Sequence, residues 1–351
     1  MRRKTKPVYY GDIGVGGDAP ITVQSMTNTD TRDVSSTVKQ IKALTEKGCD
    51  IIRVAVPDMD AAKVLNKIKK QIDIPLIADI HFDYRLAIEA VNQSVDGLRI
   101  NPGNIGSKER VKEVVKVCKE HGVPIRIGVN SGSIGREYLR QYGGVNETSM
   151  VQSALDHIKI LEDMDFTDIV VSLKASDVRL TINAYKKMAE YVDYPFHVGI
   201  TEAGTMMTGT IKSSIGIGSL LLMGLADTIR VSLTENPIKE VEVGRQILNV
   251  LGLRRDNVEI ISCPTCGRTE VDLIKLVKEA EEKLKDLNAP LKVAIMGCVV
   301  NGPGEAREAD IGIAAGKGVG LIFSKGKIIK KVKEEKLIDE LIHAIKKTYG
   351  C

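Results

Sequence analysis

The sequence contains no tryptophan, and aromatic residues make up only 4% of its 351 residues. Proteins that bind single-stranded nucleic acid stack the bases on aromatic side chains, so this composition argues against that class. No apolar run is long enough to span a bilayer. No apolar signal core follows the basic N-terminus. We therefore expect a cytoplasmic protein that binds neither membrane nor nucleic acid.

The charge pattern does not point to a particular class of partner either. The formal net charge is +4, and basic and acidic residues are mixed along the chain rather than gathered in blocks. Such mixing does not require a nucleic-acid partner. The six cysteines favour metal or redox chemistry over disulfides in a long cytoplasmic chain. The length suits one large domain and one small one.

Short β-rich runs, each followed by a helical pattern, recur along the first two thirds of the chain. The predicted strands are Ile21–Met26, Asp50–Val56, Pro75–Ile80, Gly97–Asn101, Pro124–Asn130, Asp168–Lys174, Phe196–Thr201 and Asp227–Thr234. Regular alternation of strand and helix predicts parallel strands, and this number of units favours a closed (β/α)8 TIM barrel over an open sheet. The glycine-rich segment before Ile21 predicts a hairpin at the bottom of the barrel.

The pattern changes at the polar stretch 253–257, which predicts a domain boundary. Domain 1–253 is then the barrel, and domain 254–351 is a compact α+β domain. Its predicted elements are the strand Val258–Ser262, the helix Val271–Leu287, the strand Lys292–Met296 and the helix Lys336–Tyr349.

Charged residues alternate with apolar ones along the predicted barrel strands. Because successive strand side chains face opposite sides, the apolar set must face the helices and the other set must point into the barrel. The residues placed inside in this way include Arg53, Arg99, Arg126, Asn130, Lys174, His197, Arg230 and Ser232. Crowded cations repel one another, and guanidinium groups bind phosphate with paired hydrogen bonds. The pattern predicts a phosphorylated or diphosphate substrate.

The alternative is that each inward arginine pairs with a structural carboxylate. Only Asp79 and Glu202 are predicted to lie among them, so the alternative is weaker for the set than for any single arginine. Glu202, just after the seventh strand, is the candidate acid or base. A salt bridge to Arg230 or Lys174 is the competing interpretation of Glu202.

Three cysteines follow predicted strands of the second domain. Cys263 and Cys266 form a C-x-x-C turn, and Cys298 follows the next strand. Three thiolates at such turns can share one metal centre. An iron–sulfur cluster ranks first, a zinc site second and a redox pair third, since no histidine lies near them in the sequence. Glu305 is the nearest candidate for a fourth ligand, with a solvent-facing turn residue as the alternative.

Several motifs together resemble one family, the bacterial 4-hydroxy-3-methylbut-2-enyl diphosphate synthases of the methylerythritol phosphate route to isoprenoids. The resemblance covers nearly the whole chain, in the short bacterial form. The motifs are QSMTNT at 24–29, DIHFD at 79–83, RINPGN at 99–104, RIGVNSGS at 126–133, SLKAS at 172–176, HVGITEAG at 197–204, CPTCGR at 263–268 and CVVNGPGE at 298–305.

The resemblance implies an iron–sulfur oxidoreductase with a [4Fe–4S] cluster on Cys263, Cys266, Cys298 and Glu305. The implied reaction is the reductive ring opening and dehydration of 2-C-methyl-D-erythritol 2,4-cyclodiphosphate to (E)-4-hydroxy-3-methylbut-2-enyl diphosphate. Ferredoxin or flavodoxin would donate the two electrons. The resemblance also implies a head-to-tail homodimer, in which the cluster domain of one chain serves the barrel of the other.

By the same motifs, Arg53, Arg99, Arg126, Asn130, Lys174 and Ser232 would hold the diphosphate, and Glu202 would be the acid or base. Two other classes stay open. A metal-stabilised barrel lyase acting on a sugar phosphate would need no reductant. A basic RNA-binding protein with a structural metal would show steep salt dependence, but inward-facing arginines argue against it.

Overall fold

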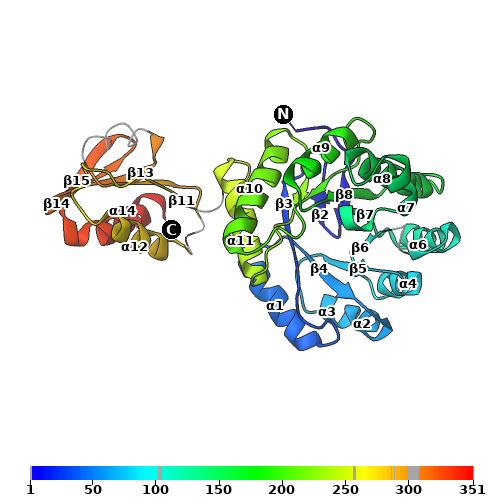
Figure 1. Ribbon diagram of the computed structural model, residues 1–351. Coiled ribbons are helices and arrows are strands. Elements are labelled where there is room, and N and C mark those ends of the chain that lie inside the picture. Colours follow the sequence, from blue (N-terminus) through cyan, green and yellow to red (C-terminus); the bar gives the residue numbers. More distant parts are fainter. Residues whose placement is uncertain are drawn as a thin grey trace. The chain divides into compact units, whose positions relative to one another are not determined.

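The computed structural model describes residues 2–101, 105–255, 258–285, 287, 289–298 and 308–350. The chain divides into two compact units, Met1–Ile247 and Leu248–Cys351 (Figure 1). The division lies a few residues before the boundary predicted from the polar stretch. No described helix is long and apolar enough to cross a membrane.

The first unit is a barrel of eight parallel strands. In the sheet they lie in the order β8-β7-β6-β5-β4-β3-β10-β9, and a parallel bridge from Val171 of β8 to Phe196, next to β9, joins the two ends. The strands are β3 (Thr22–Met26), β4 (Ile51–Val56), β5 (Leu76–Ile80), β6 (Gly97–Ile100), β7 (Ile125–Asn130), β8 (Ile169–Lys174), β9 (His197–Val198) and β10 (Thr228–Ile229). The predicted TIM barrel is confirmed.

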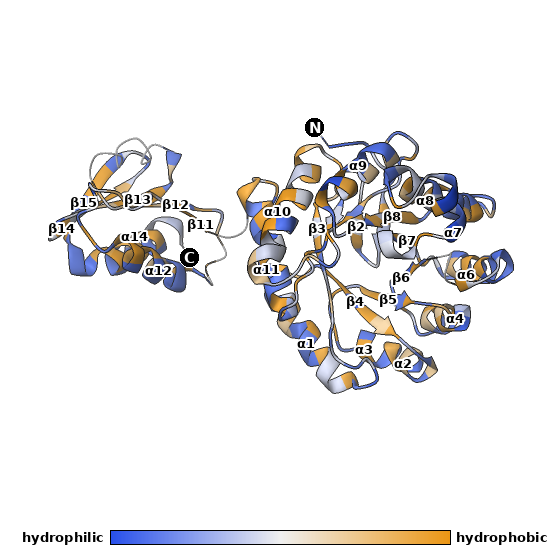
Figure 2. Ribbon diagram, viewed as in Figure 1, coloured by the Kyte–Doolittle hydropathy of each residue, from blue (hydrophilic) through white to orange (hydrophobic). Residues whose placement is uncertain are grey.

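Helices surround the strands and turn apolar faces toward them (Figures 1 and 2). Side chains of Asp33, Asn146 and Asp177 cap the N-termini of α1, α8 and α9, and Gly122, with a φ of 65°, ends α6. The helices are α1 (Val34–Glu46), α2 (Met59–Lys63), α3 (Leu65–Lys69), α4 (Tyr84–Asn92), α6 (Lys108–His121), α7 (Arg136–Gln141), α8 (Glu147–Glu162), α9 (Val178–Met188), α10 (Met206–Leu222) and α11 (Pro237–Val250).

A hairpin of β1 (Val8–Tyr10) and β2 (Ile13–Val15) precedes the barrel, as predicted. Its buried residues Val8, Tyr10 and Val15 share an apolar cluster with Ile51, Ile77 and Val170. The latter three lie at or next to the amino ends of their strands, so the hairpin fills that end of the barrel. The opposite end, where the strands run into their following loops, is left to the polar residues.

Two predicted strands are much shorter than expected. Phe196–Thr201 is reduced to β9 and Asp227–Thr234 to β10. At this point the two backbones approach closely, since a Cβ at Gly199 would lie 2.3 Å from the carbonyl oxygen of Arg230. Only glycine fits such an approach. The polar ends of both segments therefore belong to loops at the carboxyl ends of the strands.

The second unit is a mixed five-stranded sheet in the order β11-β12-β13-β14-β15. The first three strands are parallel and the last two antiparallel. Its elements are β11 (Glu259–Ser262), α12 (Leu273–Leu284), β12 (Lys292–Met296), β13 (Ile311–Gly316), β14 (Val319–Ser324), β15 (Lys327–Lys333) and α14 (Leu337–Tyr349). The larger core cluster joins both helices to one sheet face. A smaller cluster, including Met296, Ala314 and Phe323, lies on the other. The predicted α+β architecture is confirmed.

Candidate functional site

The interior of the barrel is lined by cations from five different strands or their ends. Arg53, Arg99, Arg126 and Lys174 are all buried, and Arg230, directly after β10, is partly buried. These are five of the positions that the strand alternation predicted. Neighbouring cations and burial both disfavour the charged forms, and burial is the main cause that lowers the pKa values of Arg53 and Lys174 well below their usual range.

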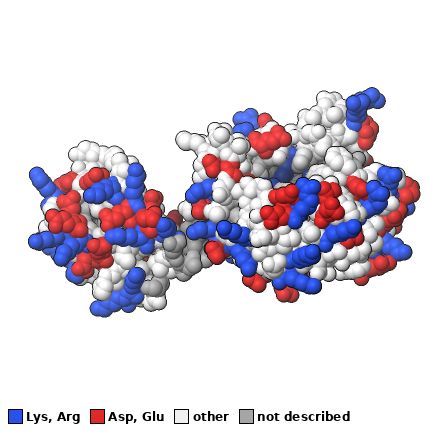
Figure 3. All heavy atoms as spheres, turned by 90° about the horizontal axis from the view of Figure 1, so that it is seen from below, with Lys and Arg blue, Asp and Glu red and all other residues white. Residues whose placement is uncertain are grey.

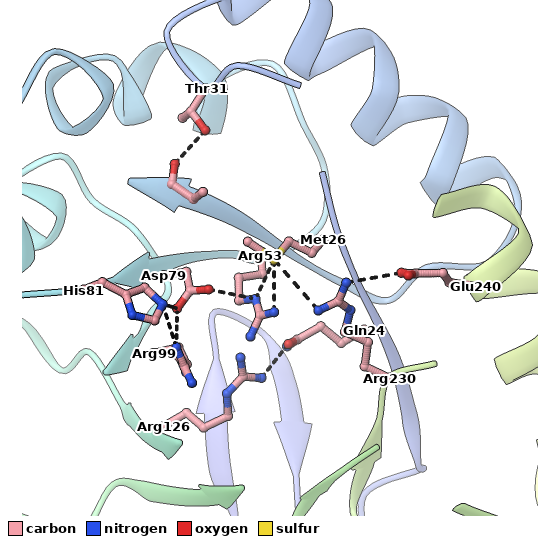
Figure 4. A network of polar contacts seen from close by, with 11 residues as sticks. Gln24, Met26, Thr31, Arg53, Asp79, His81, Arg99, Arg126, Arg230 and Glu240 are labelled. Atoms are coloured by element: carbon pink, nitrogen blue, oxygen red, sulfur yellow. Dashed lines mark hydrogen bonds and ion pairs between the residues drawn. The ribbon is translucent and has the colours of Figure 1, made fainter. Parts of the chain in front are cut away.

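One carboxylate lies in the middle of the group (Figure 4). Asp79 of β5 lies 3.1 Å from Arg99 and 3.6 Å from Arg53, and His81 lies 3.4 Å from it. Burial alone would raise the pKa of Asp79, but Arg53, His81 and Arg99 together hold that pKa far below the ordinary value. Asp79 is therefore ionised and balances part of the positive charge.

A second carboxylate enters from a helix. Glu240 of α11 lies 3.4 Å from Nη2 of Arg230 and accepts the backbone N–H of Leu233. The thioether of Met26 lies beside Arg230 and Arg53, with Sδ 3.0 Å from Nη2 of Arg53 and 3.9 Å from Nη1 of Arg230 (Figure 4). These contacts fix two guanidiniums on either side of one neutral sulfur.

The most buried cation is Arg126, at 1% exposure. It donates from Nη1 to the side-chain oxygen of Gln24, while Nε and Nη2 have no hydrogen-bond partner among the described residues. Burial lowers the pKa of Arg126 to about 10. A buried donor without a partner is costly, so these atoms are suited to a ligand oxygen.

His197 shares this environment. Neither ring nitrogen has a partner among the described residues, and the ring is fully buried. Burial, with Arg126 and Lys174 nearby, lowers the pKa of His197 well below its usual value. The imidazole is therefore neutral at physiological pH and offers one donor and one acceptor.

The other predicted residues of the site lie nearer the mouth. Asn130 ends β7 and Ser232 follows β10, and both are partly buried. Glu202 lies in the loop after β9, with a left-handed φ of 51°, and is exposed. Glu202 is therefore not buried among the cations, and it has no ion pair within the described ranges.

The prediction missed Glu240, Gln24 and Met26. The alternation rule, applied to β3, would have found Gln24 and Met26, because they occupy the face opposite Val23. No comparable signal marks Glu240. It lies in the first turn of α11, and only the tertiary fold brings that turn to the barrel mouth.

The cysteines follow neighbouring parallel strands of the second unit. Cys263 comes directly after β11 and Cys298 two residues after β12, and Ser262 pairs with Ile295 in the sheet. The N–H of Gly297 donates to the sulfur of Cys263 at 3.3 Å. Cys266 is exposed, and a backbone hydrogen bond involving Arg268 lowers the pKa of its thiol. Cys263 and Cys298 thus lie at the carboxyl edge of this sheet, and Cys266 lies in the loop that follows Cys263.

This donor set suits an iron–sulfur cluster in its chemistry, because thiolates are its usual ligands and backbone N–H groups stabilise its sulfur. In the described part of the chain, no three Cys, His, Asp or Glu side chains are close enough together to hold a metal ion. The predicted fourth ligand, Glu305, lies outside the described residues. Cys49 and Cys118 are buried in the first unit, and burial raises both of their thiol pKa values.

Comparison with known proteins covers both units. Residues 5–245 match the GcpE TIM-barrel domain, and residues 259–347 match the GcpE protein C-terminal domain. Over 347 residues the chain is 61% identical to 4-hydroxy-3-methylbut-2-en-1-yl diphosphate synthase (flavodoxin) of Caldanaerobacter subterraneus subsp. tengcongensis. This alignment covers 99% of this chain and 98% of that protein. The protein of the same name from Clostridium acetobutylicum is 60% identical over 345 residues, covering 98% and 99%.

Among solved structures, the dihydropteroate synthase of Yersinia pestis is similar to the first unit in fold. The TM-score is 0.51 at 12% identity, and the match covers 70% of this chain and 98% of that one. A likeness at this identity supports the barrel architecture alone.

Proposed function

The chain belongs to the GcpE family over both of its units, and we propose that it is an iron–sulfur oxidoreductase of isoprenoid precursor synthesis. Its substrate is 2-C-methyl-D-erythritol 2,4-cyclodiphosphate and its product (E)-4-hydroxy-3-methylbut-2-enyl diphosphate. Two electrons and two protons enter, the diphosphate ring opens and water leaves. The relatives are named for flavodoxin, which we propose as electron donor, with ferredoxin as the other predicted one.

The observation that carries the substrate assignment is the charge inside the barrel. Five cationic side chains face two carboxylates, Asp79 and Glu240. A cyclic diphosphate brings negative charge that balances the remainder, and its oxygens can accept from Nε and Nη2 of Arg126, which have no partner in the described part of the chain. Guanidinium groups fixed by Asp79, Glu240 and Met26 need little rearrangement to bind it.

We assign diphosphate binding to Arg53, Arg99, Arg126, Asn130, Lys174, His197, Arg230 and Ser232. Glu202 is the proposed acid or base near the reacting carbon. It follows a barrel strand at the carboxyl end, where TIM-barrel enzymes carry their catalytic groups. Its exposure leaves it in proton exchange with water until substrate covers the mouth.

We propose a [4Fe–4S] cluster held by Cys263, Cys266, Cys298 and Glu305. Bound there, the cluster would supply the electrons and a Lewis-acidic iron for the substrate oxygen that leaves. We also propose that the protein works in the cytoplasm as a head-to-tail homodimer, in which the second unit of one chain serves the barrel of its partner.

The test is anaerobic turnover. Cluster-loaded protein is incubated with the cyclodiphosphate and reduced methyl viologen, and the product is identified by phosphorus NMR and mass spectrometry. The proposal predicts the ring-opened diphosphate, whose mass is that of the substrate plus two hydrogens minus one water. An Arg126→Met variant should form this product much more slowly. Failure of cluster-loaded protein to form this product would contradict the proposal. Conversion without any reductant would instead favour a barrel lyase.

A further inference from the structure

The sheet of the second unit ends in a strand rich in lysine. Residues 325–336 contain six lysines and two glutamates, a net charge of +4, which equals that of the whole chain. The other charges therefore cancel, and on the face seen in Figure 3 acidic and basic side chains are interspersed. The hairpin of β14 and β15 is one of the places where net positive charge gathers; residues 2–6 and 61–70, both in the first unit, also carry a net charge of +4.

Two of these lysines lie on the sheet face opposite α12 and α14, the face of Met296 and of the smaller core cluster, against which Cys263 also packs. Met296 of β12 pairs with Ala314, Ala314 with Leu321, and Leu321 with Lys331. Directly paired residues share a sheet face, so Lys331 is on the face of Met296, two residues before Cys298. Three strand spacings separate them, roughly 14 Å.

The next row of the sheet brings a second lysine to the carboxyl edge. Gly316 pairs with Val319 and Val319 with Lys333. The turn between β13 and β14 also contacts the cysteine loop, because the N–H of Lys317 donates to Glu270 at 3.1 Å. Glu270 in turn donates its N–H to the carbonyl of Gly297, next to Cys298.

We propose that Lys317, Lys331 and Lys333, here called the cysteine-side lysines, form the docking surface for an acidic electron-donor protein. All three are exposed, and none has an ion pair within the part of the chain that the structure describes. Lys330, by contrast, is paired with Glu340 of α14 at 2.6 Å. The carboxylates of Glu270 and Glu334 also lie at this turn, where they accept the N–H groups of Lys317 and Gly318. The exposed ammonium groups themselves stay available to attract an acidic surface and orient it toward the cysteine edge.

The competing explanation is that lysines on β15 merely prevent pairing with another sheet edge. The same hairpin separates the two explanations. Lys325 and Lys327, the far-end lysines, are also exposed and also lack ion pairs among described residues. They lie at the other end of the hairpin, where Ser324 pairs with Lys327 and with Ile311. Lysines that protect the sheet edge are needed at both ends of the hairpin. Lysines that dock a partner beside the cysteines are needed only at the cysteine end.

This inference rests on the proposed function, which names flavodoxin as donor. The experiment therefore measures binding directly. The dissociation constant of purified flavodoxin is determined at low salt for the unchanged protein, for Lys331→Glu/Lys333→Glu and for Lys325→Glu/Lys327→Glu. Viologen-driven turnover is measured alongside, and far-UV circular dichroism checks folding.

The cysteine-side variant should bind flavodoxin about 10-fold or more weakly and lose most of the salt dependence of binding. The far-end variant should stay within about twofold, since it keeps the charges beside the cysteines. Viologen-driven turnover should be unchanged in both. Equal weakening by the two variants, or none by the cysteine-side variant, would overturn the inference. Absent turnover in the unchanged protein would count against the proposed function alone, because the binding comparison stands without it.

Discussion

The Nη1 atom of Arg99 lies 3.1 Å from Oδ1 of Asp79, and the two residues are directly paired on adjacent parallel strands. The same carboxylate lies 3.6 Å from Nε of Arg53. One ionised aspartate thus supports two buried guanidiniums of the barrel. This pairing explains how the fold tolerates the cations before an anion binds, and it makes the pair testable.

Replacing Asp79 by asparagine should destabilise the protein by about 3–5 kcal/mol, because two buried cations lose their counter-charge. Because its folded pKa is lowered, the stabilisation is present above the ordinary carboxyl pKa of about 4 and is lost as pH falls below it. Urea unfolding at neutral pH measures the loss. Glu242→Gln, which breaks an exposed pair with Lys239, is the control and should change little. A comparable effect of the two substitutions would contradict the assigned role of Asp79.

Replacing Arg126 should weaken anion binding without lowering the stability of the protein. Arg126→Met removes a buried cation whose Nε and Nη2 have no partner among the described residues, so the free energy of unfolding should stay the same or rise. Pyrophosphate at 100 times its dissociation constant should stabilise the unchanged protein by about 2.7 kcal/mol. The variant should need at least about 10-fold more pyrophosphate for the same gain, since one charge-assisted contact is lost. Equal gains in both proteins would remove Arg126 from the anion site.

His197 should make the protein sensitive to mild acid. Its folded pKa is lowered, so below about pH 6.5 the unfolded chain binds a proton that the folded chain does not. The free energy of unfolding should therefore fall as pH decreases, by up to about 1.4 kcal/mol per pH unit. His197→Gln should remove this part of the slope, as measured by urea unfolding between pH 7 and 5.

His157 provides the matched control for that measurement. It is a buried histidine of α8, outside the barrel interior, and burial lowers its pKa to about 4. His157→Gln should remove a separate part of the slope, so the effects of the two substitutions should add. Pyrophosphate binding should change only in the His197 variant. If the pH dependence of the free energy of unfolding is unaltered in the His197 variant, the imidazole of His197 is not held buried in its neutral form.

The proposed homodimer predicts complementation between inactive chains. Cys298→Ala removes a proposed cluster ligand and Glu202→Ala removes the proposed acid or base. If each site combines the barrel of one chain with the second unit of the other, mixed dimers should regain one working site. Turnover is measured after co-expression with two different affinity tags, which isolates the mixed species. Confirmed mixed dimers without activity would contradict the shared site.

Much of the barrel could be predicted because its strands follow one simple rule. Arg53, Arg99 and Arg126 stand between branched apolar residues, and a strand with one apolar face must turn the other inward. Helix ends such as Gly122 are equally local features. The strand Lys292–Met296 has the predicted bounds.

The features that the sequence did not predict depend on contacts between segments that are distant along the chain. β9 ends at Val198, next to Gly199, and no local pattern reveals the close approach of Gly199 to Arg230. Glu202 is exposed in the loop that follows β9. Glu240 reaches Arg230 from a helix whose first turn lies over the barrel mouth. Charge balance inside a barrel is therefore harder to predict than the identity of its inward cations.

The central claim is that Cys263, Cys266 and Cys298 hold an iron–sulfur cluster, and metal analysis tests it most directly. Iron, acid-labile sulfide and zinc are measured on anaerobically purified protein, on Cys298→Ser and on Cys118→Ser, a buried cysteine of α6. The account predicts about four iron and four sulfide per chain, lost in Cys298→Ser and kept in Cys118→Ser. Zinc without sulfide, in protein never exposed to air, would contradict it.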